Sequence, residues 1–255
     1  MGLYVELVSS QPTEALLSFS QVSFSYPQTP VLSDLSFSVK KGEIVGFLGV
    51  NGAGKTTSFL LATGLLKPQS GAVKIVGYDP AAGKEWAHSV GVMMAGAGLY
   101  PRLTVARNLS FFAELYGIQV DIEGHLRQHS MASQINKKAQ QLSHGYRRRL
   151  ALARATLHSP RLLLLDEPAD GLDPGATEAL HSYLKNYRNE GGAVVLTSHR
   201  LEEVERLCDR ILLLSEGKIV AQGAPEELSQ RVDGQGLRAL ILKIQAGVGL
   251  SDSKL

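Results

Sequence analysis

The sequence has one cysteine, Cys208, in 255 residues, so it can form no internal disulfide bond and gives no sign of an oxidising compartment. It also lacks an excess of charge of one sign. Its 26 Lys and Arg residues are nearly balanced by 24 Asp and Glu residues. The chain therefore has no overall electrostatic field that would attract it to nucleic acid or an acidic membrane. No apolar run approaches the ~18 residues of a spanning helix, and the N-terminus has no basic start followed by a long apolar stretch. We therefore expect a soluble, cytoplasmic chain with no nucleic-acid partner.

Apolar residues are plentiful enough for a substantial core. Hydrophobic residues make up 44% of the chain and charged residues 20%, which is ordinary for a globular protein. The length suits one large domain or two small ones. We expect an N-terminal extension at 1–14, a main domain at 15–228 and a C-terminal tail at 229–255 without a clear pattern.

Alternating apolar and polar residues predict an antiparallel β portion at the N-terminal side. Residues 15–26 alternate in this way, and a second alternating stretch follows. The apolar run from Ile44 to Leu48 predicts a buried strand, and a helix pattern begins after Gly54. Short strands are expected at 71–77 and 89–94.

The character of the sequence changes between about residues 96 and 160, where we expect a helical insert. Thr104 suits the N-cap of a helix, Val105 and Leu109 follow helical spacing, and Gly117 suits its end.

Strands and helices alternate beyond the insert. The run RLLLLDE, residues 161–167, is typical of a strand buried on both faces of a parallel sheet, and residues 193–199 resemble it. Asp173 and Pro174 favour a helix start, and Pro225 opens the last predicted helix. The expected fold class is α/β: a phosphate-loop NTPase core with a parallel sheet, an N-terminal antiparallel β portion and an α-helical insert.

The segment GVNGAGKTT, residues 49–57, fits the phosphate-loop pattern G-x-x-x-x-G-K-[ST] between a buried strand and a helix. Its glycines let backbone N–H groups converge on phosphate oxygens beside the positive end of the helix. Lys55 would bind the β- and γ-phosphates, and the Thr56 hydroxyl would bind Mg²⁺. The alternative is a glycine-rich turn without a ligand. The predicted nucleotide-binding residues of the loop are Gly49, Val50, Asn51, Gly52, Ala53, Gly54, Lys55, Thr56 and Thr57.

The segment LLLLDEP, residues 162–168, supplies two acids that suit a phosphate site. Asp166 would hold Mg²⁺ through water, and Glu167 would orient and deprotonate an attacking water. Apolar strands that end in acids are common, so this segment carries weight only together with the phosphate loop.

The segment LSHGYRRR, residues 142–149, allows two interpretations: a basic patch for nucleic acid or a short anion-binding signature. On a helix the three arginines turn by about 100° each, so they fan around it rather than form one stripe. Because near-neutral charge supplies no wider basic surface, we interpret the arginine run as mostly a solvated or subunit-facing edge. The apolar face of the helix would consist of Tyr146, Leu150, Ala153 and Leu157.

The order of these segments resembles the ATP-binding cassette (ABC) family from about Leu16 to Leu228. The phosphate loop, the signature, the acid pair, DGLD at 170–173 and TSH at 197–199 appear in family order. The resemblance implies an ATPase subunit of a transporter that uses ATP and Mg²⁺. It also implies a homodimer, or a pseudo-dimer with a related subunit, on the cytoplasmic face of the membrane against a separate membrane-spanning permease.

The resemblance also implies roles for single residues. Ser143 and Gly145 of one subunit would close over the γ-phosphate held by the loop of the other, and a hydroxyl with helix-start amides suits an anion. Tyr26 would stack on adenine, with an ordinary strand-end tyrosine as the alternative. His199 would contact the γ-phosphate, and Asp173 would cross the subunit interface or simply cap its helix. The predicted catalytic residues are Glu167, His199 and Lys55.

The sequence departs from the family pattern after the strand VGVMM, where most members place a glutamine that reaches Mg²⁺ and the membrane partner. The nearest residue here is Ala95, whose methyl group cannot coordinate a metal. The segment resembles the branch of NatA-type sodium and drug exporters, in which this glutamine is often missing, so we expect export. Val50 also replaces the usual proline of the loop.

Two alternatives to transport stay open at this point. One is a soluble ABC-type ATPase that acts on ribosomes or DNA, although such relatives usually carry tandem cassettes or long coiled coils. The other, prompted by Ala95, is a nucleotide-binding module without turnover.

Overall fold

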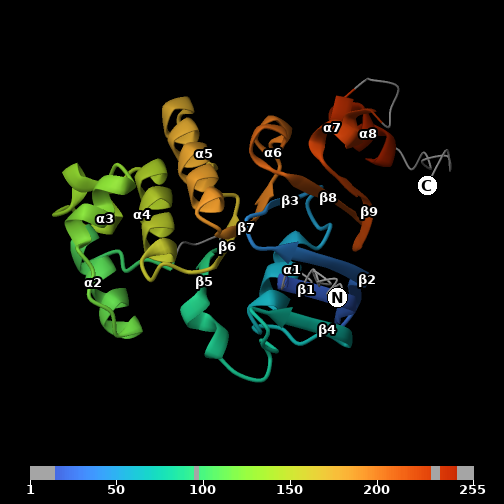
Figure 1. Cartoon of the computed structure of the whole chain (residues 1–255), viewed down its shortest axis with the longest axis horizontal. Coiled ribbons are helices and arrows are strands. Elements are labelled where there is room, and N and C mark those ends of the chain that lie inside the picture. Colours follow the sequence, from blue (N-terminus) through green and yellow to red (C-terminus); the bar gives the residue numbers. More distant parts are fainter. Residues whose placement is uncertain (1–14, 95–97, 231–235, 246–255) are drawn as a thin grey trace, which may run out of the picture.

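The computed structural model describes residues 15–94, 98–230 and 236–245, which form two β-sheets surrounded by helices (Figure 1). The extension at 1–14 and Ala95, on which two of the sequence expectations rest, lie outside the described residues. Within the described ranges, no helix combines the length and the apolar character that crossing a membrane requires.

The smaller sheet is antiparallel and has the strand order β2-β1-β4. The alternation in the sequence turns Phe19 and Phe37 to one face, where they lie opposite each other with ring centroids 4.7 Å apart. Phe37 also packs edge-on against Phe47 of the larger sheet, at 5.1 Å between centroids. The two sheets therefore share a core. The strands are β1 (Ala15–Tyr26), β2 (Thr29–Lys40) and β4 (Ser70–Ile75).

The larger sheet has six strands in the order β5-β6-β7-β3-β8-β9, parallel except for the last pair. Because neighbouring parallel strands end at the same edge, the segments that follow β3, β6 and β7 come together there. That edge receives the phosphate loop, the acid pair and the TSH segment. The strands are β3 (Ile44–Gly49), β5 (Val90–Met93), β6 (Leu162–Asp166), β7 (Ala193–Ser198), β8 (Arg210–Ser215) and β9 (Lys218–Gly223).

Successive residues of the central strands enter two different cores, one on each face of this sheet. Leu162 and Leu164 join the core under the antiparallel sheet, whereas Leu163 and Leu165 join the core under α5, α6 and α8. Because β6 is buried on both faces, its sequence is a continuous apolar run rather than an alternating one. The helices around the sheet are α1 (Lys55–Ala62), α5 (Pro174–Asn189), α6 (Leu201–Leu207), α7 (Pro225–Gln230) and α8 (Gly236–Gln245).

The helical insert has a third core of its own and forms the left side of the molecule in Figure 1. The Thr104 hydroxyl accepts a hydrogen bond from the Arg107 amide at 3.1 Å, and Gly117 ends the same helix at φ 65°, as predicted. The insert contains α2 (Val105–Tyr116), α3 (Ile122–Gln128) and α4 (His144–Thr156) with the 3₁₀ turns Ala132–Gln134 and Ala139–Gln141; another 3₁₀ turn, Glu85–Ser89, precedes β5.

The helix at Pro225 is the last one predicted from the sequence, whereas the structure continues with α8. Leu237 and Leu240 of this helix are completely buried in the core on the α5 and α6 side. A ten-residue helix has too few periodic apolar positions for a firm prediction from sequence. Its stability comes mainly from the packing of its apolar side chains against the core. In its main features, the expected α/β fold with an antiparallel portion and a helical insert is confirmed.

Candidate functional site

The phosphate loop runs from the end of β3 into α1. Gly54 is the residue before α1 and has φ 105°, a left-handed conformation that favours glycine. A Cβ atom at this position would lie 2.5 Å from Cδ2 of Leu32, so the leucine side chain would also have to move. The loop therefore brings bare backbone to the N-terminal end of α1, as an anion-binding loop requires.

Lys55 folds back over this loop. Its Nζ donates hydrogen bonds to the carbonyls of Gly49 at 2.6 Å and of Val50 at 3.1 Å. Burial lowers the pKa of Lys55, and the negative charges of Glu167 and Asp166 oppose this change. The loop lysine and the two acids thus lie within electrostatic reach of one another, as the sequence analysis expected.

The first acid, Asp166, ends β6 and is buried. The Thr197 hydroxyl donates to Oδ1 of Asp166 at 2.6 Å and accepts from the backbone amide of Glu167 at 3.0 Å. One threonine of β7 therefore orients both acids. Thr197 is not among the residues predicted for the site, although a hydroxyl residue directly before the Ser-His pair is a visible signal in the sequence.

The second acid, Glu167, is held by His199. Nδ1 of His199 lies 2.8 Å from Oε2 of Glu167, and the His199 amide donates to the same oxygen at 3.3 Å. Glu167 also has φ 49°, an uncommon conformation for a residue with a side chain and one that often marks functional sites. The sequence predicts separate roles for Glu167 and His199 but not the contact between them.

The residues at this edge suit Mg²⁺ by the chemistry of their donor atoms. Thr56, exposed at the start of α1, offers a hydroxyl, and Asp166 offers a carboxylate. Mg²⁺ prefers oxygen ligands and keeps several waters, so one or two carboxylates with substrate phosphates suffice. No cluster of three or more His, Cys, Asp or Glu side chains arranged for a metal occurs in the part of the chain that the structure describes. An all-protein metal cage among those residues is therefore not the pattern here.

The signature residues lie in a different cavity. Ser143 is the N-cap of α4, where its hydroxyl accepts from the Tyr146 amide at 3.3 Å. A cavity of about 310 Å³ joins this helix start to the DGLD segment, and Asp173 caps α5 by accepting from the Ala176 amide at 2.8 Å. The residues that line it are Ser143, His144, Gly145, Tyr146, Arg149, Gly171, Leu172, Asp173 and Ala176. They include no member of the phosphate loop or the acid pair, so one chain does not unite the two halves of the predicted site.

The three arginines fan around α4 as predicted, but they are not equivalent. Arg148 has only 12% of its side chain exposed and donates to the carbonyl of Asp166 and to Oδ2 of Asp170, both at 3.3 Å. The prediction of a solvated or subunit-facing edge is wrong for Arg148, because the carbonyl of the acid strand attracts it inward. Arg149, by contrast, lies 4.0 Å from Asp173 and over the ring of Tyr146.

Tyr26 lies at the end of β1 and is 41% exposed. Its ring meets that of Phe24 edge-on, with centroids 5.1 Å apart. The paired strand β2 touches the phosphate loop through Leu32 and Gly54. A role for Tyr26 in stacking on adenine stays a prediction.

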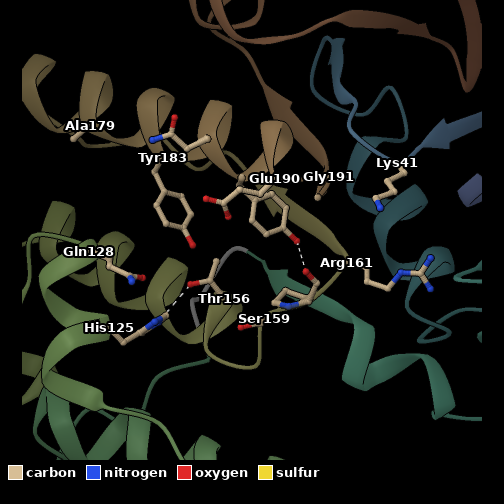
Figure 2. A pocket seen from close by; sticks show the side chains of 14 residues that line it. Lys41, His125, Gln128, Thr156, Ser159, Arg161, Ala179, Tyr183, Glu190 and Gly191 are labelled. Atoms are coloured by element: carbon tan, nitrogen blue, oxygen red, sulfur yellow. Dashed lines mark hydrogen bonds between the residues drawn. The ribbon is translucent and has the colours of Figure 1, made fainter.

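A wide cavity of about 800 Å³ opens at the amino ends of the strands, away from these residues. Figure 2 shows His125 and Gln128 of the insert on one side of it and Tyr183 of α5 on the other. Burial lowers the pKa of His125, whose Nε2 lies 2.7 Å from the carbonyl of Ala153. None of its lining residues is a predicted site residue, so the candidate site stays at the opposite, carboxyl edge of the sheet.

Comparisons with known proteins agree with this geometry. A sequence model of the family described as "ABC transporter" matches residues 32–170. Nod factor export ATP-binding protein I of Rhizobium etli is 36% identical over 224 residues, which cover 86% of this chain and 71% of that protein. ABC transporter ATP-binding protein NatA of Bacillus subtilis is 34% identical over 226 residues, covering 84% and 91%.

The fold is also similar to that of a solved structure described as an ATP-binding subunit of an ABC transporter. The TM-score is 0.83 at 29% identity, with 90% of this chain and 99% of the other covered. With a family model that spans more than half of its length and relatives above 30% identity over most of it, the chain belongs to the ABC transporter family as an ATP-binding, ATP-hydrolysing subunit.

Proposed function

We propose that this chain hydrolyses ATP between its phosphate loop and its acid pair, and thereby drives export through a membrane-spanning permease. The observation that carries the proposal is the Glu167–His199 contact at 2.8 Å, with both acids within electrostatic reach of Lys55. Residues 15–228 would form the ATPase domain, and α8 of the segment after residue 228 would complete it, since Leu237 and Leu240 are buried in its core. The relatives reported above are named as transporter subunits, which favours transport over action on ribosomes or DNA.

The phosphate loop would bind ATP through its backbone. Amides from Gly49 to Thr57 would converge on the β- and γ-phosphates at the positive end of α1. Lys55 would exchange its two carbonyl contacts for the phosphates, since an ammonium group binds a phosphate oxygen more strongly than a neutral carbonyl. Tyr26 would stack on the adenine ring.

Thr56 and Asp166 would hold Mg²⁺, which neutralises charge on the phosphates when it is bound. Thr197 supports this assignment, because its hydroxyl fixes the orientation of the Asp166 carboxylate. Because that carboxylate is already oriented, its side chain loses less conformational entropy when the ion binds.

Glu167 would accept a proton from the attacking water. The water oxygen then forms a bond to the γ-phosphorus while the bond from that phosphorus to the β,γ-bridging oxygen breaks, leaving ADP and inorganic phosphate. His199 would hold the carboxylate in place and contact the γ-phosphate. A positioned base of this kind contributes about 10²–10⁴-fold in rate.

Two copies of the chain would complete two sites. Ser143 and Gly145 of one copy would cover the γ-phosphate bound by the other, as a homodimer or a pseudo-dimer with a related subunit. The separation of the signature cavity from the phosphate loop in one chain supports this arrangement. Export is supported by the name of the Rhizobium etli relative, a Nod factor export protein, and by the branch that the sequence resembles. The subunit would then lie on the cytoplasmic face of the membrane.

The test is phosphate release by the purified chain, measured with ATP and Mg²⁺ and again after removal of Mg²⁺ by a chelator. We expect hydrolysis that depends on Mg²⁺ and stops with the chelator. Tight ATP binding with no phosphate release above the protein-free rate, alone and with the permease, would instead identify a binding module without turnover.

A further inference from the structure

We infer that Glu203 is a positioning residue for His199 that acts through the buried hydroxyl of Ser198 and is paired with His181. The inference rests on the proposed contact of His199 with the γ-phosphate. Glu203 lies in α6, His181 in α5 and Ser198 at the end of β7, and each of the three is at most 4% exposed. The proposed reaction assigns none of them a role.

Ser198 fixes the turn that carries His199. Its hydroxyl accepts from the Arg200 amide at 3.0 Å and donates to Oε2 of Glu203 at 2.6 Å. The Glu203 amide in turn donates to the Arg200 carbonyl at 3.2 Å. The residues on both sides of His199 are therefore tied to Glu203, while the imidazole of His199 is left to contact Glu167.

The second oxygen of Glu203 faces His181. Oε1 of Glu203 lies 3.8 Å from Nε2 of His181, and neither atom has a hydrogen-bond partner among the described residues. Leaving polar atoms unpaired in a core is costly, so such a pair calls for an explanation. Burial, reinforced by the negative charge of Glu203, raises the pKa of the nearby Cys208 thiol, which therefore stays neutral and adds no charge to the pair.

Stability alone is a weak explanation for this pair. Apolar side chains of similar volume are often at least as stabilising as a buried pair of polar groups. What the pair does provide is a defined link between two elements of the site. His181 belongs to α5, which is capped by Asp173 of the DGLD segment, and Glu203 holds the turn at His199. The contact joins these two segments inside one chain.

The test compares catalysis with stability in the double variant His181→Leu/Glu203→Leu. We expect kcat for ATP hydrolysis to fall about tenfold or more, since a displacement of ~1 Å at a reacting centre costs up to about a hundredfold. We expect KM for ATP to stay within about twofold and Tm to be equal or higher, because well-packed apolar side chains can replace a buried polar pair. Glu202→Leu, at the exposed neighbouring carboxylate, is the matched control and should leave kcat unchanged.

Two single variants keep the test decisive if the double variant is unstable. Glu203→Gln retains an acceptor for the Ser198 hydroxyl, so its kcat should lie between those of wild type and Ser198→Ala. Ser198→Ala removes one hydroxyl and should lower kcat by a similar factor without weakening ATP binding. Values of kcat that follow Tm across all these variants, or that stay within twofold of wild type, would overturn the inference.

His199→Ala separates this inference from the proposed function. If His199→Ala lowers kcat and the double variant adds no further loss in that background, both groups act through the same residue. If His199→Ala lowers kcat but the double variant alone does not, only the role of Glu203 is refuted. If His199→Ala has no effect, the proposed role of His199 is wrong, and the inference falls with it.

Discussion

A single carboxylate oxygen of Glu167 is held by two groups of His199, the ring nitrogen Nδ1 at 2.8 Å and the backbone nitrogen at 3.3 Å. The two residues are 32 positions apart in the sequence and meet because β6 and β7 are neighbours in the sheet. Because the carboxylate is fixed in this way, no further entropy is lost in orienting it during the reaction. The histidine thus orders the base before the substrate arrives.

The first prediction concerns this base. Glu167→Gln keeps the shape of the side chain but removes its ability to take a proton from water. Hydrolysis should fall by about 10²–10⁴-fold while ATP binding is retained. Steady-state phosphate release and nucleotide binding by fluorescence titration measure the two quantities. A rate within twofold of wild type would show that another group is the base.

The second prediction concerns Lys55. Lys55→Ala removes a half-buried charged donor of the phosphate loop, and hydrogen bonds to charged groups contribute about 1.5–3 kcal/mol. The Kd for ATP should therefore rise by roughly ten- to a hundredfold. Lys41→Ala is the control, because Lys41 is an exposed lysine that lines the cavity at the amino ends of the strands. Equal effects of the two substitutions on Kd would refute the assignment.

The third prediction concerns the signature. Glu167→Gln protein should dimerise with ATP in gel filtration, because the nucleotide is bound and not consumed. Adding Ser143→Arg places bulk and charge at the cavity shared with DGLD and should abolish that dimer. Ser182→Arg, at an exposed position of α5, should leave it intact. A dimer that persists with Ser143→Arg would mean that the signature faces elsewhere.

Local signals in the sequence predicted much of the fold. Thr104 and Asp173 cap helices as expected, because a cap depends on residues within one turn. The apolar run of β6 also predicted its burial on both faces. Elements whose type depends on near neighbours were therefore accessible from the sequence.

Contacts between distant segments were not accessible in this way. The orientation of Asp166 and Glu167 by Thr197, and the inward turn of Arg148, depend on which strands and helices lie side by side. No periodicity or spacing in the sequence encodes that order. Helix α8 is a related case. Its short apolar pattern does not predict a helix by itself, and the helix is stabilised by packing of Leu237 and Leu240 into the core.

The fourth prediction concerns pH and the buried His129. Burial, with a contribution from the neighbouring His125, lowers the pKa of His129 to about 3. A histidine that is neutral when folded stabilises the protein above its ordinary pKa, and this contribution is lost as the pH falls from ~6.5 toward 3. His129→Gln, which can still reach the Thr156 hydroxyl, should remove the effect.

Urea unfolding at pH 7.5 and pH 5.5 measures this contribution. Between the two values, wild type should lose about 1.4 kcal/mol more unfolding free energy than His129→Gln. Comparing the two proteins cancels the titration of the other groups. Equal losses would mean that His129 titrates alike in the folded and unfolded states.

The last prediction returns to the arginine run. Arg148→Met should lower the free energy of unfolding by about 1–3 kcal/mol, because the Asp166 carbonyl and Asp170 lose a buried charged donor. Arg149→Met should cost only about 0–1 kcal/mol, since its Nη2 lies as far as 4.0 Å from Oδ2 of Asp173, whose side chain is 71% exposed. Both changes remove one positive charge from adjacent positions of α4, so each controls for the net charge of the other. Equal losses in urea unfolding would mean that the run acts as one exposed basic edge, as the sequence alone had suggested, rather than as a single arginine anchored to the acid strand.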